Sequence, residues 1–305
     1  MHTAFAAPTA LLNQIERHKW WLDQRHDGVR LYAENSSWNE LRVEKADLRA
    51  ALLSRSSFLE ADFAGAQFNL ADLRLCDFRR AILTGADFMG AKLENTVFMN
   101  AFLNEAIFAD TVFDSTDFAY AQMRSATLQA ARGRRSVFSQ ADLRLASAQQ
   151  SHWAECNFSG ANLKEANFLR AQISYCRFYG VSAERLNLAN AKLQRADFTR
   201  SELYGLRATG AEILHSVFCG AQLAQAQFRD ANLEGSDFSS AFLEGARFTG
   251  TQLRGVDFRA ANLRGCREIH PDQLALAQTD NRTVLPNGTS GPYVRRSGAE
   301  RPILR

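Results

Sequence analysis

Residues 71–88 read Ala-Asp-Leu-Arg-Leu-Cys-Asp-Phe-Arg-Arg-Ala-Ile-Leu-Thr-Gly-Ala-Asp-Phe, and this pattern decides the fold. A small residue, a polar residue and a bulky apolar residue recur together every five positions, as in Ala71-Asp72-Leu73 and Ala86-Asp87-Phe88. A period of five is neither the 3.6 of a helix nor the 2 of an ordinary strand. It predicts a backbone that turns after each short extended segment and points its small and bulky residues inward.

Phenylalanine marks a longer period of twenty, which is four fives. The five-residue pattern runs without insertion from Leu48 to Leu263, and a fixed period held this long indicates a repeat architecture. One inward phenylalanine is therefore expected in every fourth segment. The predicted core column is Phe58, Phe78, Phe98, Phe118, Phe138, Phe158, Phe178, Phe198, Phe218, Phe238 and Phe258.

The unit Ala-Asp/Asn-Leu/Phe-x-x resembles the repeat of the pentapeptide-repeat family. Clean copies are Ala141-Asp142-Leu143, Ala161-Asn162-Leu163 and Ala231-Asn232-Leu233, and the resemblance covers about residues 46 to 266. It implies an all-β fold, a right-handed quadrilateral β-helix or solenoid. The phenylalanine column then predicts about 11 coils. The resemblance also implies short α-helical caps at both ends.

The chain divides into four expected parts. Residues 1–28 are an N-terminal segment and capping helix, with residues 1 to 8 disordered, and 29–266 are the β-helix. A C-terminal capping segment follows at 267–286, and 287–305 are a flexible basic tail. The resemblance to the family's lead-in and closing segments rests on His18, Trp21, Gly28 and Arg30 and on a short helix from about His270, followed by Leu285-Pro286. Run backwards, the register places Trp38 in the phenylalanine column.

The repeats contain glycine corners and a few defects. Thirteen of the 18 glycines lie two residues after a bulky position, where a turn with positive φ is expected. Large and small residues trade places at Val181/Ala183 and Leu206/Ala208. Near Gly133 and Ala148 the bulky slot is almost empty, and Trp153 overfills another. A local distortion is therefore expected over about 130 to 153, serving either as a binding feature or as compensated repeat drift.

Composition favours a non-enzymatic protein. No serine–histidine–aspartate or cysteine–histidine set is expected to converge, so no catalytic residue, metal site, cofactor or small-molecule substrate is predicted. No apolar run is long enough for a membrane helix, and the start lacks the regions of a signal peptide. The expectation is a cytoplasmic, bacterial protein that does not enter a membrane and whose buried cysteines are reduced.

The outward positions hold the candidate binding residues. Charge is uneven, since acidic residues outnumber basic ones over residues 46 to 120 and the reverse holds over 121 to 266. At a spacing of twenty, one outward column forms a basic ladder that continues to Tyr204, and Tyr175 and Tyr179 flank a neighbouring corner. A solvated face and a surface for an acidic partner both remain open. The candidates are Arg124, Arg144, Lys164, Tyr175, Tyr179, Tyr204, Arg132, Arg134 and Arg135.

Three functions follow from these features. The first is a protein–protein interaction scaffold or adaptor that presents outward side-chain columns to a protein partner. The second comes from the family resemblance alone, which includes DNA mimics that protect DNA gyrase against quinolones or toxins; the net charge of +3 disfavours it. The third, nucleic-acid binding through the basic half, ranks lowest because aromatic residues are sparse there.

Overall fold

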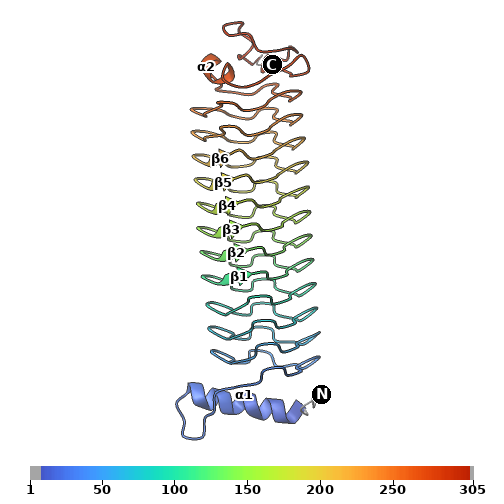
Figure 1. The fold of residues 1–305 in the computed structure, drawn as a ribbon, viewed down its shortest axis with the longest axis vertical. Coiled ribbons are helices and arrows are strands. Elements are labelled where there is room, and N and C mark those ends of the chain that lie inside the picture. The colour runs from blue at the N-terminus through green and yellow to red at the C-terminus, as the bar shows by residue number, and fades with distance from the viewer. Residues whose placement is uncertain (1–7, 303–305) are drawn as a thin grey trace. The chain divides into compact units, whose positions relative to one another are not determined.

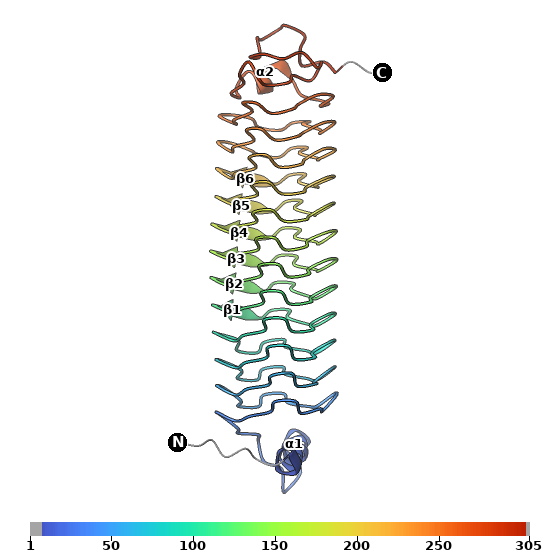
Figure 2. The ribbon, with the colours of Figure 1, turned by 90° about the vertical axis from the view of Figure 1, so that its right-hand side faces the viewer.

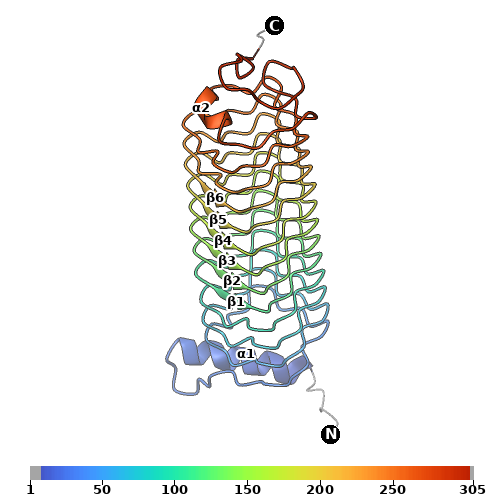
Figure 3. The ribbon, with the colours of Figure 1, turned by 45° about the horizontal axis from the view of Figure 1, so that its top comes forward.

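The computed structural model describes residues 8–302. It contains two compact units, Met1–Ser147 and Ala148–Arg305, and each is described by itself. Within each unit the chain winds as stacked coils (Figures 1 and 2), and Figure 3 shows the coils of each unit from an oblique direction. The disorder expected for residues 1 to 8 falls, except for Pro8, outside the described residues.

The first unit begins with helix α1 (Pro8–Leu22) and continues as parallel pairs between residues twenty apart. These pairs run from Tyr32↔Leu52 to Thr127↔Ser147. Two short strands, β1 (Val112–Asp114) and β2 (Arg132–Arg134), pair in parallel with Phe113 opposite Gly133. The constant offset confirms that four five-residue segments make one coil in this unit.

The second unit repeats the same plan. Strands β3 (His152–Ala154), β4 (Gln172–Ser174), β5 (Lys192–Gln194) and β6 (Glu212–Leu214) pair in parallel in chain order, again at an offset of twenty. Isolated parallel pairs continue to Arg247↔Arg267, and helix α2 (Pro271–Leu274) follows. Both units are therefore parallel β-solenoids, as predicted. Handedness and the number of coils stay predictions.

Most corners are built from a β-turn that begins at the bulky residue. The carbonyl of Phe138, for example, accepts the N–H of Ala141 at 3.1 Å, and Gln140 between them has a φ of 59°. A positive φ at the third residue is the mark of a type II turn, and it explains the thirteen corner glycines. Many non-glycine residues adopt the same conformation here, so glycine eases this corner without being required.

The inward positions form the core in both units. All eleven members of the phenylalanine column are buried, with exposed fractions of 0–1%. Successive rings stack with centroids 4.4 Å apart for Phe58–Phe78 and 4.7 Å apart for Phe158–Phe178. That distance is close to the ~4.8 Å spacing of paired strands, so one ring per coil fills the interior without a gap. Trp38 extends the column, stacking on Phe58 at 5.7 Å.

The repeat defects do not disturb the register within either unit. Gly133 is paired opposite Phe113 in the first unit, and Trp153 is paired opposite Ile173 in the second. The distortion expected over 130 to 153 is therefore absent from the pairing inside each unit. The swapped residues Val181 and Ala183 are fully buried, so exchanging large and small side chains leaves the inward face closed.

The N-terminal helix is tied to the first coil by a buried histidine. His18 Nδ1 accepts the N–H of Leu31 at 3.0 Å, and its Nε2 lies 3.0 Å from the carbonyl of Arg49. Accepting at Nδ1 requires the proton to be on Nε2, which then donates to Arg49. The ring also stacks on Trp21, with 5.4 Å between centroids. These contacts involve backbone groups at the edge of the first coil, while the capping role stays a prediction.

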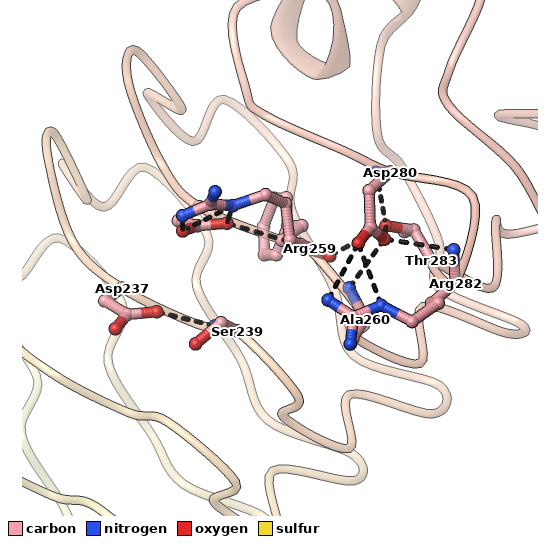
Figure 4. Close-up of polar contacts among 9 residues, drawn as sticks. Asp237, Ser239, Arg259, Ala260, Asp280, Arg282 and Thr283 are labelled. Carbon is pink, nitrogen blue, oxygen red and sulfur yellow. Dashed lines mark hydrogen bonds and ion pairs between the residues drawn. The ribbon is translucent and has the colours of Figure 1, made fainter.

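At the other end, Asp280 takes the place of a backbone acceptor. Its Oδ1 accepts the N–H of Ala260 at 2.9 Å, whereas one coil earlier the N–H of Ser240 bonds to the carbonyl of Arg259. Figure 4 shows this carboxylate surrounded by Ala260, Thr283 and Arg282. A side chain thus supplies the acceptor that a further regular coil would offer.

The C-terminal segment differs from the expected flexible tail at 287–305. Up to residue 302 it folds back: Leu285 bonds to Thr289, Asn287 bonds to Ala299, and Tyr293 donates its hydroxyl to Glu300. Ala299 and Glu300 are both buried. The prediction rested on polar composition, which does not show that both backbone and side-chain hydrogen bonds hold these residues. Within residues 8–302, no helix has the length and apolar character needed to span a membrane.

Candidate functional site

The fold leaves three of every five side chains directed outward, and many of these are already occupied. Aspartate at the second position of a unit accepts the N–H two residues later and often binds an arginine there. Asp142 does so with Arg144, at 2.8 Å from Nε and 2.6 Å from Nη2. Arg144 is the first cause that holds the pKa of Asp142 below its ordinary value. The same arrangement occurs at Asp47/Arg49, Asp72/Arg74, Asp77/Arg79 and Asp257/Arg259.

The predicted basic ladder is therefore weaker than its sequence suggests. Arg144 is neutralised by Asp142, while Arg124 is exposed and its N–H bonds to Asn104 at 3.0 Å. Lys164 belongs to the second unit, so the structure does not place it against the two arginines. Whether Lys164 belongs to the ladder stays a prediction. In the first unit the ladder keeps the charge of Arg124 but loses that of Arg144.

Three of the candidate arginines surround the empty slot at Gly133. Arg132 and Arg134 lie in β2 and are exposed on its outward side, while Gly133 points inward and is buried. Arg135 binds Asp114 Oδ1 at 2.8 Å. This corner thus carries two exposed guanidinium groups beside an ion pair.

The candidate tyrosines lie in the second unit and two of them contact arginines. Tyr175 is 54% exposed and the guanidinium of Arg195 lies over its ring at 5.6 Å. Tyr179 is 42% exposed and its hydroxyl accepts a bond from Arg200 at 3.3 Å. Residues 176–178 separate these two tyrosines, so they lie at the two ends of one side of the coil. Tyr204 is exposed on another segment.

Sequence reasoning missed a buried polar column at one small position. Ser216 Oγ accepts the N–H of Ala196, and Ser236 Oγ accepts the N–H of Ser216, each at 3.1 Å. These corners follow β5 and β6, where the usual turn bond is replaced by a side-chain acceptor. The signal was available as a spacing of twenty: Ser36, Ser56, Cys76, Thr96, Thr116, Ser136, Cys156, Cys176, Ser216 and Ser236.

The buried thiols and hydroxyls have a structural role. Burial raises the pKa of the Cys76 thiol to about 12, and a protonated thiol is a poor nucleophile. Burial also raises the pKa of Cys266. Among residues 8–302 no three histidine, cysteine or acidic side chains gather as metal ligands do. What the described surface offers is exposed arginine, tyrosine and amide side chains.

Repeat models match most of the chain. The model described as pentapeptide repeats (8 copies) matches residues 44–80, 57–95, 94–129 and 226–265, and that of a pentapeptide repeat region matches 149–228. The chain belongs to the pentapeptide-repeat family. The expected resemblance is confirmed, and members of this family are generally structural or interaction proteins.

Several solved structures are similar to the chain at low identity. HetL from Nostoc sp. strain PCC 7120, involved in heterocyst differentiation regulation, is 19% identical, with 89% of this chain and 96% of HetL covered and a TM-score of 0.32. A trypsin-treated QnrB1, a plasmid-mediated fluoroquinolone resistance protein, is 19% identical, with 74% and 88% covered and a TM-score of 0.26. Rfr23 from Cyanothece 51142 is 22% identical, with 45% and 89% covered and a TM-score of 0.23. No curated protein matches the chain.

Proposed function

We propose that the chain is a non-enzymatic protein-interaction scaffold whose main binding surface is the tyrosine corner, defined as Tyr175, Tyr179, Arg195 and Arg200. The observation that carries the proposal is that each exposed tyrosine of this corner is held against an arginine. Tyrosine and arginine are enriched among the residues that dominate protein–protein binding energy. Side chains held in place before binding also lose less conformational entropy on association.

The strand pairing that carries these side chains supports the same function. Residues of β4 pair with those of β5 in fixed register, with Ile173 opposite Leu193, so Tyr175 and Arg195 lie at equivalent corners of neighbouring coils. A partner would meet an unchanging array of rings and guanidinium groups. The positive excess after residue 120 favours a partner with an acidic surface.

A pull-down from lysate of the native cells tests this proposal. The full chain should recover a specific protein, and the double substitution Y175A/Y179A should lose it. Tyr120→Ala is the matched control, because Tyr120 is 57% exposed but belongs to the first unit. A second arm replaces Arg124, Arg144 and Lys164 by glutamate. Recovery of no partner, or equal loss with Tyr120→Ala, would contradict the tyrosine corner as the binding surface.

Protection of DNA gyrase by DNA mimicry is the weaker alternative. A mimic presents uncompensated negative charge, whereas Asp47, Asp72 and Asp77 of the first unit are each bound to an arginine two residues later. The scaffold proposal therefore predicts no effect of the chain on supercoiling by gyrase in the presence of a quinolone. Clear protection at micromolar protein would favour the alternative.

A further inference from the structure

An open groove of about 510 Å³ lies on the second unit, away from the tyrosine corner. Its walls come from one corner position and from the second position of the next segment. Counted along the twenty-residue coil, the groove lies about half a coil away from the segment that Tyr175 and Tyr179 flank. Its lining residues are Glu165, Arg185, Gly205, Arg207, Gln225, Gln227 and Arg247.

One wall contains Arg207 and Arg247, and their column continues beyond the groove to Arg267. Arg207 pairs with Gln227, Gln227 with Arg247, and Arg247 with Arg267 through backbone bridges, so their side chains lie on successive coils. All three arginines are exposed. Within residues 8–302 none of the three guanidinium groups makes a hydrogen bond or ion pair. This column differs from the Asp–Arg pairs elsewhere, where the charge is already neutralised.

The arginines also replace residues that would have satisfied the backbone. At the second position of other units, Asn187 accepts the N–H of Ala189 at 3.1 Å and Asn232 accepts that of Glu234 at 3.0 Å. Arginine has no acceptor, so the units at Arg207 and Arg247 give up this local bond. Backbone satisfaction therefore does not explain arginine at these positions.

The rest of the groove is suited to a polypeptide. Gly205 leaves the corner without a side chain, and Gln225 and Gln227 supply amides that both donate and accept, as a peptide backbone requires. Glu165 lies 3.8 Å from Arg185, so the one acidic lining residue is balanced. No aromatic residue lines the groove. Single-stranded nucleic acid is disfavoured, because its binding depends on stacked aromatic side chains.

We propose that this groove binds an extended acidic segment of a partner protein, with carboxylates held by Arg207 and Arg247. Guanidinium groups bind carboxylates through two parallel hydrogen bonds, which gives both affinity and orientation. The two arginines lie two coils apart, about 10 Å at the strand spacing, which acidic residues three apart in an extended segment also span. The inference rests on the proposed function, since it assumes that the chain binds proteins, but it uses a separate face.

Fluorescence anisotropy with the full chain tests the groove directly. The probe is a fluorescein-labelled peptide with four Glu-Gly-Ser repeats, compared with its glutamine counterpart and with a thymidine oligonucleotide of equal formal charge. R207E and R247E should each weaken binding of the acidic probe by about tenfold or more, because each removes a charge-assisted contact. R207K/R247K should weaken it less, since charge remains while the paired geometry is lost.

Arg177→Glu is the matched control, because Arg177 is also exposed and at a second position but does not line the groove. It should leave binding nearly unchanged, and thermal melting should show that all variants fold. No measurable binding of the acidic probe, equal loss with R177E, or tighter binding of the oligonucleotide would each overturn the proposal. Loss of the cellular partner only in Y175A/Y179A, with probe binding intact, would separate the groove from the tyrosine corner.

Discussion

One outward column differs in charge between the two units. At the second position of the same segment the first unit has two acidic residues among neutral ones, in the order Asp47, Gln67, Asp87, Ile107, Thr127 and Ser147. The second has three basic residues among neutral ones, in the order Asn167, Asn187, Arg207, Gln227, Arg247 and Arg267. The inward phenylalanine column, two segments further along each coil, does not change in this way, since phenylalanine is buried throughout both units. Packing therefore constrains the inward residues alike in both units, while the outward residues are free to differ in charge.

The cores of the two units are also not equal. Phe98 stacks on Phe78 and Phe118 at 5.0 Å and meets Phe88 and Phe108 edge-on at 5.6 and 6.0 Å. Phe198 stacks on Phe178 at 4.5 Å and on Phe218 at 5.0 Å, and the facing column holds Leu188 and Ala208 instead. Two aromatic columns thus interlock around Phe98, whereas only one column is aromatic around Phe198; elsewhere in the second unit Phe168, Phe228 and Phe248 occupy the facing column.

The largest expected effect comes from emptying these columns. Phe98→Ala and Phe198→Ala should each lower the free energy of unfolding by about 3–5 kcal/mol, through lost burial and the cavity left behind. Phe98→Ala should cost more, because each aromatic pair adds about 0.5–1.5 kcal/mol beyond its buried area. Urea unfolding of both variants measures the difference. A larger loss for Phe198→Ala would contradict the interlocked-column explanation.

Substitutions in the buried polar column should change stability by an intermediate amount. Ser216→Ala removes the acceptor for the N–H of Ala196 and should cost about 1–3 kcal/mol. Thr96→Val should cost about 1 kcal/mol or less, because Leu73 O still accepts the N–H of Cys76 and the N–H of residue 96 keeps its bond to Leu93. Urea denaturation of the two variants gives the order, and equal costs would show that the side-chain acceptor is not needed.

The two ends should lose their contacts at different pH. Burial lowers the pKa of His18, so its contribution to stability is complete above the unfolded-state pKa of about 6.5 and is lost as the pH falls below it. The Ala260 N–H, followed by Thr283 and Arg282, holds the pKa of Asp280 well below its ordinary value. The Asp280 contribution is present above the unfolded-state value of about 4 and is lost only in stronger acid.

Hydrogen exchange resolves the two ends separately. Between pH 7 and pH 5 the N–H of Leu31, which is bonded to His18, should lose protection beyond the intrinsic pH effect, while the N–H of Ala260 should not. His18→Gln should remove the pH dependence at Leu31 and leave Ala260 unchanged. Parallel loss of protection at both amides over this range would show that His18 does not control the first end.

The sequence was sufficient for the inward residues and insufficient for the outward ones. A period of twenty places Phe158 and Trp38 in the core because burial imposes the same requirement on every coil. Whether Arg144 is free or bound depends on a contact with Asp142 that the repeat pattern leaves open. The groove beside Arg207 was missed because it depends on two features together: Gly205 at the corner and no aspartate nearby to neutralise the arginine. Neither feature alone is unusual. The folded segment at 287–302 was missed because its polar composition does not show which backbone and side-chain hydrogen bonds it makes.

The smallest expected effect on stability is at the tyrosine corner. Tyr179→Ala should change the free energy of unfolding by about 0.5 kcal/mol or less, since the ring is exposed and only its hydroxyl contacts Arg200. Partner binding should fall sharply with the same substitution, so stability and binding separate at this residue. The opposite result is expected one residue away at Phe178, which stacks on Phe158 and Phe198. Phe178→Ala should lower the free energy of unfolding strongly while leaving the exposed binding side chains in place. A large stability cost at Tyr179 would mean that the inward and outward assignment of this corner is wrong.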